Sequence, residues 1–223
     1  MRRPQWLEAV VVSEASAVAA GMSELIGLAQ SAGVMVDYCS AGEFAQFALT
    51  EGPQGVLCVM RKPVEGAPTQ LDSLCTVILD RVQEPGNFGT ILRTAWALGL
   101  HQVWATSGSA DVWSPKVVRS GMGAQFALDV HYFADLSVAL EAFRGLGGTR
   151  IWCAVMDAAT TCFSPAFVAH GAAIVLGNEG NGISAPELGD GVTIPMPGHA
   201  ESLNVAQAAT VLMFEALRQS GED

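Results

Sequence analysis

Polar residues that could do chemistry gather in three turns of the sequence, each of which follows a short apolar segment. In the first turn, Pro85 and Gly86 redirect the chain, and Asn87 stands where a helix N-cap would be. Arg93 follows on a stretch that is otherwise apolar, where a guanidinium is costly unless it faces a cleft or a partner. Arg93 is therefore a candidate to face a binding cleft or a partner molecule. On these residues alone, Asn87 can equally be only a cap and Arg93 only a surface charge.

The second turn, residues 177–184, is rich in glycine and carries one acid, Glu179. No lysine follows its last glycine, and a carboxylate would repel a phosphate, which argues against a nucleotide-phosphate loop. A glycine-rich turn with one carboxylate suits a polar ligand that bears hydroxyls or a positive centre. The alternative is a tight turn in which the glutamate is incidental.

The third turn, residues 194–201, contains two prolines and a glycine and leads to Ser202, which we expect to cap an alanine-rich helix. His199 in this turn is the most obvious titratable group. No cysteine, aspartate or second histidine lies at ligand or triad spacing from it, so we interpret His199 as a bystander.

Apolar runs that alternate with helical patterns must position these turns. From residue 71 onward they predict strands at 76–80, 103–105, 151–156, 172–176 and 192–194, and helices at 89–99, 115–120, 135–144 and 202–219. Strands that are apolar throughout indicate a parallel sheet covered on both faces. Ligands bind at the carboxyl ends of such strands, near the N-termini of the helices that follow, and the three turns occupy such places.

The first sixty residues predict a smaller α/β unit, with helices at 15–30 and 43–49 and strands at 34–36 and 55–60. Residues 61–70 hold two prolines and a glycine, which is typical of a linker. The sequence therefore predicts two domains, residues 1–68 and residues 69–223.

Eleven Lys+Arg stand against 22 Asp+Glu, which gives a formal net charge of −11. This acidity argues against a general basic coat for nucleic acid but allows a local basic face. No apolar run of about 18 residues appears, so we expect a cytoplasmic protein without a membrane segment. The five cysteines are scattered, with none at Cys-x-x-Cys spacing, so we expect neither disulfides nor a metal site.

Taken together, the three turns resemble the motifs of the SpoU-type, or TrmH-like, branch of the SPOUT superfamily of RNA ribose 2′-O-methyltransferases. The resemblance rests on residues 85–95, residues 176–184 and residues 194–205, and it covers about residues 71–219. It implies an α/β domain whose parallel sheet ends in a C-terminal trefoil knot, S-adenosyl-L-methionine as cofactor, a homodimer, and a small N-terminal domain that binds RNA. Residues 114–123 also resemble a segment of the members that modify rRNA.

The same resemblance implies roles for individual residues. It places in catalysis Arg93, Asn87, Glu179, Ser202 and Asn204. It places in the cofactor pocket Leu176, Gly177, Asn178, Gly180, Ile194, Pro195, Met196, Leu203 and Asn204. It implies RNA contacts from Arg119, Lys116 and Arg81. Because a guanidinium is essentially always protonated, we expect Arg93 to orient the ribose or its phosphate and to stabilise an oxyanion rather than to act as a base.

The leading hypothesis is a methyltransferase of rRNA ribose. A tRNA-directed enzyme, a knotted dimer that binds RNA or cofactor without turnover, and a methyltransferase of small molecules remain as alternatives. The acidic charge favours the last of these. The joint presence of the five expected catalytic residues favours an active enzyme over a binding protein.

Overall fold

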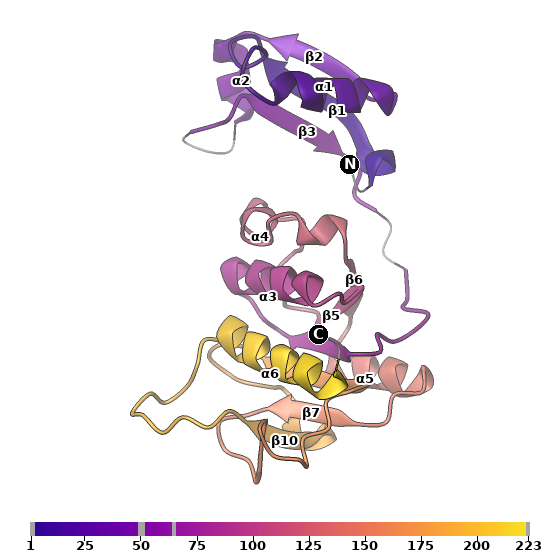
Figure 1. Ribbon diagram of the computed structural model, residues 1–223, viewed down its shortest axis with the longest axis vertical. Coiled ribbons are helices and arrows are strands. Elements are labelled where there is room, and N and C mark those ends of the chain that lie inside the picture. Colours follow the sequence, from indigo (N-terminus) through magenta and orange to yellow (C-terminus); the bar gives the residue numbers. More distant parts are fainter. Residues whose placement is uncertain (1–2, 49–51, 64–65, 222–223) are drawn as a thin grey trace. The chain divides into compact units, whose positions relative to one another are not determined.

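The computed structural model describes residues 3–48, 52–63 and 66–221. The chain divides into two compact units, residues 1–64 and residues 65–223, and each is described by itself (Figure 1).

The N-terminal unit is a three-stranded sheet with two helices. Its elements are a 3₁₀ turn η1 (Pro4–Trp6), β1 (Leu7–Ser13), α1 (Met22–Ser31), β2 (Met35–Cys39), α2 (Ala41–Phe47) and β3 (Val56–Met60). The strand order is β2-β1-β3, with β2 parallel and β3 antiparallel to β1. Val10 and Val12 of β1 pack against Met22 and Ala29 of α1 to form a small separate core.

The C-terminal unit is built on a seven-stranded sheet in the order β6-β5-β4-β9-β7-β10-β8, in which all neighbouring strands are parallel. Its strands are β4 (Cys75–Asp80), β5 (Gln102–Thr106), β6 (Asp129–Phe133), β7 (Ile151–Ala154), β8 (Thr160–Thr161), β9 (Ala172–Gly177) and β10 (Asp190–Thr193). Its helices are α3 (Pro85–Ala97), α4 (Pro115–Ser120), η2 (Ala124–Phe126), α5 (Leu136–Gly145), η3 (Pro186–Leu188) and α6 (Val205–Ser220).

Two separate hydrophobic clusters cover the two faces of this sheet. Buried residues of α3, α4 and α6, such as Phe88, Val117 and Leu212, form the larger cluster. Leu140 and Phe143 of α5 form the other cluster on the opposite face. The predicted parallel sheet covered on both faces is therefore confirmed.

Several element boundaries differ from the prediction for local reasons. The helix predicted at 15–30 begins only at Met22, because Gly21 adopts a left-handed conformation with φ of 81°. The sequence does not predict strands β1, β6 and β8. Strands β6 and β8 are the two edge strands of the large sheet, and their polar residues leave no continuous apolar run. Within the described residues, no helix is both long and apolar enough to span a membrane.

Candidate active site

The carboxylate of Glu179 links the first and second turns of the sequence. It accepts hydrogen bonds from the backbone N–H of Gln83 at 3.3 Å, from that of Glu84 at 3.2 Å, and from the Asn87 side-chain amide at 3.0 Å. Glu179 follows β9, and Asn87 lies in the first turn of α3, which follows β4. Because β4 and β9 are neighbours in register from Cys75 to Asp80, their carboxyl ends bring these residues together.

Asn204 joins the third turn to the same group. Its side-chain N–H₂ donates to the Asn87 side-chain oxygen at 2.9 Å, and its own oxygen accepts from the backbone N–H of Ala206 at 2.9 Å. Asn204 is therefore the N-cap of α6. The expectation that Ser202 caps this helix is wrong, because the helix begins at Val205, too far along for Ser202 to reach its free N–H groups.

Asn87 is also not the cap of its helix. Glu84 caps α3 and accepts from the backbone N–H of Asn87 at 2.6 Å, while Pro85 occupies the first helical position, where its missing N–H costs nothing. The predicted start of this helix at residue 89 is four residues late for the same reason. With its backbone held by Glu84, the Asn87 side chain is free to bridge Glu179 and Asn204.

The pKa of Glu179 lies below its ordinary value. Burial by itself raises the pKa of this carboxyl, but the hydrogen bonds from the Asn87 side chain and from backbone N–H groups, including those of Glu84 and Gln83, together outweigh it. Glu179 is therefore held as a carboxylate at neutral pH.

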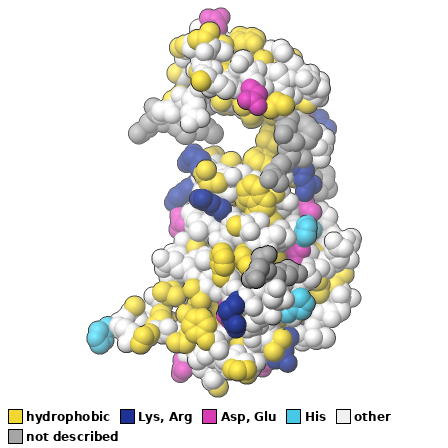
Figure 2. Space-filling view, in the orientation of Figure 1, with side chains coloured by type: hydrophobic (Ala, Val, Ile, Leu, Met, Phe, Trp, Pro, Cys, Tyr) yellow, Lys and Arg dark blue, Asp and Glu magenta, His cyan; other side chains and the backbone are white. Residues whose placement is uncertain are grey.

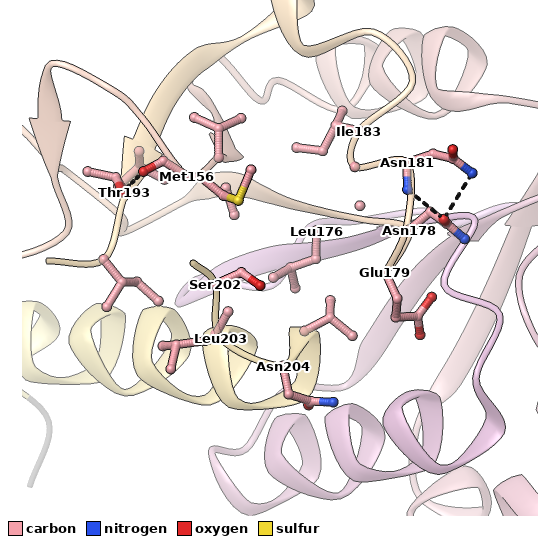
Figure 3. A pocket seen from close by; sticks show the side chains of 18 of the residues that line it. Met156, Leu176, Asn178, Glu179, Asn181, Ile183, Thr193, Ser202, Leu203 and Asn204 are labelled. Carbon is pink, nitrogen blue, oxygen red and sulfur yellow. Dashed lines mark hydrogen bonds between the residues drawn. The ribbon is translucent and has the colours of Figure 1, made fainter. Parts of the chain in front are cut away.

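A cavity of about 540 Å³ lies beside this group (Figure 3). The carboxyl ends of β7, β9 and β10, the segments that follow them and the start of α6 line it: Ala154, Val155, Met156, Leu176, Gly177, Asn178, Glu179, Gly180, Asn181, Gly182, Ile183, Val192, Thr193, Ile194, Met196, Ser202, Leu203, Asn204, Val205 and Ala208. Figure 3 shows Ser202, Leu203 and Asn204 on one side and Asn178, Glu179 and Asn181 on another. The predicted second and third turns thus face each other across one space.

Every residue expected to bind the cofactor lines this cavity except Pro195, and of the expected catalytic residues Asn87 and Arg93 do not line it. Pro195 is not among the lining residues, although Ile194 and Met196 on either side of it are. Arg93 also does not line the cavity, and it is exposed on α3. Among the described residues, no side chain forms a hydrogen bond or ion pair with Arg93.

The structure also adds lining residues that sequence reasoning missed. Val155 and Met156 follow β7, and the Met156 carbonyl accepts from the Thr193 hydroxyl at 2.9 Å. The signal available for them was their position at the carboxyl end of a parallel strand, the same rule that located the three turns.

The size and lining of the cavity suit a small molecule with both apolar and polar parts. Its volume is within the range of about 300–1,000 Å³ that is common for small-molecule sites. Leu176, Ile194 and Leu203 supply apolar walls, and Asn178 and Glu179 supply polar groups. Gly177 keeps the loop tight, because a Cβ there would overlap the backbone of Gly182 and Ile183. No three His, Cys, Asp or Glu side chains of the described residues are grouped to hold a metal ion.

The basic residues expected to contact RNA have different partners. The Lys116 ammonium donates to Glu84 at 2.6 Å, and Arg81 lies 3.6 Å from the buried Asp80. Arg119 is exposed on α4 and pairs with no side chain in the described part of the chain. Figure 2 shows Lys and Arg side chains gathered on this face over α4 and the adjoining part of α3.

The fold and the site define an α/β protein with a cavity of small-molecule size at the carboxyl ends of its parallel strands. Residues 75–214 match the SpoU rRNA Methylase family over more than half of the chain, so the chain belongs to that family.

Two relatives and one solved structure illustrate the similarity. The chain is 36% identical over 186 residues to an uncharacterized tRNA/rRNA methyltransferase of Synechocystis, covering 82% of this chain and 67% of the relative. It is 33% identical over 185 residues to the 23S rRNA (guanosine(2553)-2′-O)-methyltransferase RlmP of Bacillus subtilis, covering 82% and 72%. The crystal structure of the SpoU methyltransferase AviRb from Streptomyces viridochromogenes, in complex with AdoMet, aligns with a TM-score of 0.81 at 27% identity, over 99% and 88%.

Proposed function

We propose that this protein is an S-adenosyl-L-methionine-dependent RNA methyltransferase that acts on a ribose 2′-hydroxyl of rRNA. The observation that carries the proposal is the hydrogen-bonded group of Glu179, Asn87 and Asn204 beside the cavity, in a chain of the SpoU rRNA Methylase family. The relative RlmP is named for the same reaction on 23S rRNA, and AviRb was crystallised with AdoMet.

When bound, S-adenosyl-L-methionine would supply a methyl group carried on a positively charged sulfonium. We propose that it is held by Leu176, Gly177, Asn178, Gly180, Ile194, Met196, Leu203 and Asn204, which line the cavity. Pro195 would contribute only by shaping the turn between two lining residues. Methyl transfer needs the acceptor oxygen in line with the methyl group, so a rigid wall is itself a source of acceleration.

The ribose hydroxyl is a weak acid, so the site has to orient it and stabilise alkoxide character. We assign this work to Arg93, whose permanently charged guanidinium can bind the ribose or its phosphate. Asn87, Glu179 and Asn204 would fix the wall beside the cavity, and Ser202 would offer a hydroxyl at its edge.

Arg93 has to reach a cavity that it does not line in its own chain. We therefore propose a homodimer in which Arg93 serves the cavity of the partner subunit, with α4 offering Arg119 to the same RNA. The exposure of Arg93 and the absence of a partner for it in the described chain support this arrangement.

We also propose that the C-terminal part of the chain is knotted. The strand order β9-β7-β10 supports this, because the chain leaves β7, forms β9 on one side of it and then returns to the other side for β10. The segment that follows β10 lines the cavity together with the turn after β9. A chain that crosses itself in this way would bring the second and third motifs together.

For the N-terminal unit we propose the role of a small RNA-binding domain, residues 1–68, that works in the cytoplasm. It has its own core, distinct from those of the catalytic unit, which supports a separate role.

The direct test is incubation of the purified protein with methyl-labelled S-adenosyl-L-methionine and RNA that lacks modifications. We expect label in rRNA and none in tRNA. Label confined to tRNA would identify a tRNA-directed enzyme instead. Cofactor binding without label in any RNA would favour a binding protein or a methyltransferase of small molecules.

A further inference from the structure

Two buried carboxylates flank strand β4, one at each end. Asp72 precedes the strand and is 8% exposed, and Asp80 ends it and is 1% exposed. A buried carboxylate is costly unless hydrogen bonds satisfy it, so its donors reveal what it holds in place. Asp72 accepts from the backbone N–H groups of His101 and Gln102, both at 3.2 Å, at the start of β5. Ligand sites of parallel sheets lie at the carboxyl ends of the strands, and Asp80 is the residue at the carboxyl end of β4.

Asp80 joins the ends of three neighbouring strands. The Thr106 hydroxyl, at the end of β5, donates to one carboxylate oxygen at 3.0 Å. The backbone N–H of Ser184, in the turn after β9, donates to the other oxygen at 2.6 Å. Asp80 is also the register partner of Gly177, the last residue of β9. One carboxylate oxygen of Asp80 therefore holds the end of β5, and the other holds the turn after β9.

The residue after Asp80 completes the attachment. Arg81 has a positive φ of 56°, which is uncommon for a residue other than glycine. Its carbonyl accepts from the Asn178 side chain at 2.9 Å, and its N–H donates to the Thr106 hydroxyl at 3.0 Å. The turn that carries Glu179 is thus tied at Asn178, before the glutamate, and at Ser184, after it.

We propose that Asp80 is a positioning residue of the methyl-transfer site, which fixes the 177–184 turn so that Glu179 meets Asn87. Asp80 does not line the cavity, so it acts through the turn that does. The proposal rests on the proposed function for its catalytic consequence. Its structural part, that loss of Asp80 loosens the bonds of Glu179, does not depend on that function.

The test compares Asp80→Ala with Asp72→Ala in the full-length chain. Both remove a buried carboxylate from an end of β4, but only Asp80 lies at the carboxyl end, where it holds the turn that lines the cavity. The readouts are amide hydrogen exchange at Gln83 and Glu84, the Kd for S-adenosyl-L-methionine by calorimetry, and kcat with rRNA. Gln83 and Glu84 are informative because Glu179 holds their N–H groups and Asp80 does not.

For Asp80→Ala we expect exchange at Gln83 and Glu84 to rise by about 10-fold or more, because the turn opens locally. We expect the Kd to rise several-fold and kcat to fall by about 10-fold to 100-fold, since small misplacements cost rate. Asp72→Ala should lower the melting temperature and leave all three readouts within about twofold of the wild type.

If the alanine variant does not fold, Asp80→Asn takes its place, because it keeps one acceptor oxygen and should show smaller changes in the same direction. Equal effects of the Asp80 and Asp72 variants on all readouts would overturn the proposal. If the wild-type chain transfers no methyl group, the proposed function fails, while the exchange comparison still decides the role of Asp80.

Discussion

The side-chain amide of Asn87 donates to the Glu179 carboxylate at 3.0 Å, across 92 positions of sequence. The oxygen of the same side-chain amide accepts a hydrogen bond from the Asn204 side chain at 2.9 Å. One asparagine thus connects the three turns that the sequence singles out, and it can do so because Glu84, rather than Asn87, caps α3. The hydrogen bonds that join Glu179, Asn87 and Asn204 beside the cavity depend on an ionised Glu179, because a neutral carboxyl accepts hydrogen bonds less well.

That dependence predicts a pH effect on stability. Hydrogen bonds, opposed by burial, hold the folded-state pKa of Glu179 below the ordinary value of 4.5. Its stabilising contribution is therefore fully present above the unfolded-state pKa and is lost as the pH falls through the lowered folded-state value. We expect the difference in free energy of unfolding between the wild type and Glu179→Gln to be constant at neutral pH and to shrink below about pH 4.5.

Denaturant unfolding of both chains between pH 3 and pH 7 measures this difference. The pKa of Glu84 is also lowered, chiefly by its hydrogen bond from Lys116, but Glu84 is present in both chains and cancels in the comparison. A difference that grows toward acidic pH would contradict the assignment.

Gly177→Ala should weaken cofactor binding by about 10-fold or more, because the added methyl group displaces the backbone of the turn that lines the cavity. Calorimetric titration with S-adenosyl-L-methionine measures it. Gly198→Ala is the matched control, since a Cβ at Gly198 meets no atom within 4 Å and Gly198 does not line the cavity. Equal affinity of the two variants would remove this turn from the cofactor site.

Arg119→Ala should weaken RNA binding more than Lys116→Ala does. Arg119 is exposed and unpaired among the described side chains, whereas a phosphate has to compete with Glu84 for Lys116. The logarithm of the RNA-binding constant falls with the logarithm of the salt concentration, and we expect this slope to be less steep by about 1 in the Arg119 variant, the amount for one lost phosphate contact. Filter binding at several salt concentrations tests this, and an unchanged slope would place the RNA elsewhere.

Arg93→Ala should abolish methyl transfer and leave the cofactor Kd within about twofold, because Arg93 does not line the cavity. If the site is shared between subunits, mixing Arg93→Ala chains with Gly177→Ala chains should restore activity at a cofactor concentration well below the Kd of the Gly177 variant. A mixed dimer then has one site that combines an intact Arg93 with an intact cavity. A protein that is monomeric at micromolar concentration, or mixtures that stay inactive, would contradict the shared site.

The sequence predicts the strands of the sheet centre well, because β4 and β9 are buried along nearly their whole length and read as continuous apolar runs. It misses β6 at the sheet edge, because Asp129 and His131 interrupt the apolar residues and leave no continuous apolar run. It also predicts the wrong caps for α3 and α6. Either of two nearby polar side chains can cap a helix, and only the path of the backbone decides which one reaches the free N–H groups.

The site residues, like the strands, were in part predictable from the sequence and in part not. The position of the turns at strand ends predicts that each lies where ligands bind, and the structure shows that Glu179 and Asn87 of two of these turns are in contact. The hydrogen bonds of Asp80 could not be predicted, because an aspartate at the end of an apolar strand has no distinctive pattern. The separation of Arg93 from the cavity could not be predicted either, since it depends on the rotation of α3 about its axis.

The most direct measurement of the central claim is the chemical position of the transferred methyl group. Unmodified rRNA is incubated with the protein and isotope-labelled S-adenosyl-L-methionine, then digested to nucleosides and analysed by mass spectrometry. The account predicts that the label appears on the ribose of a single 2′-O-methylated nucleoside, and that Arg93→Ala abolishes it. Label on a base, or no label in RNA while the cofactor binds, would contradict it.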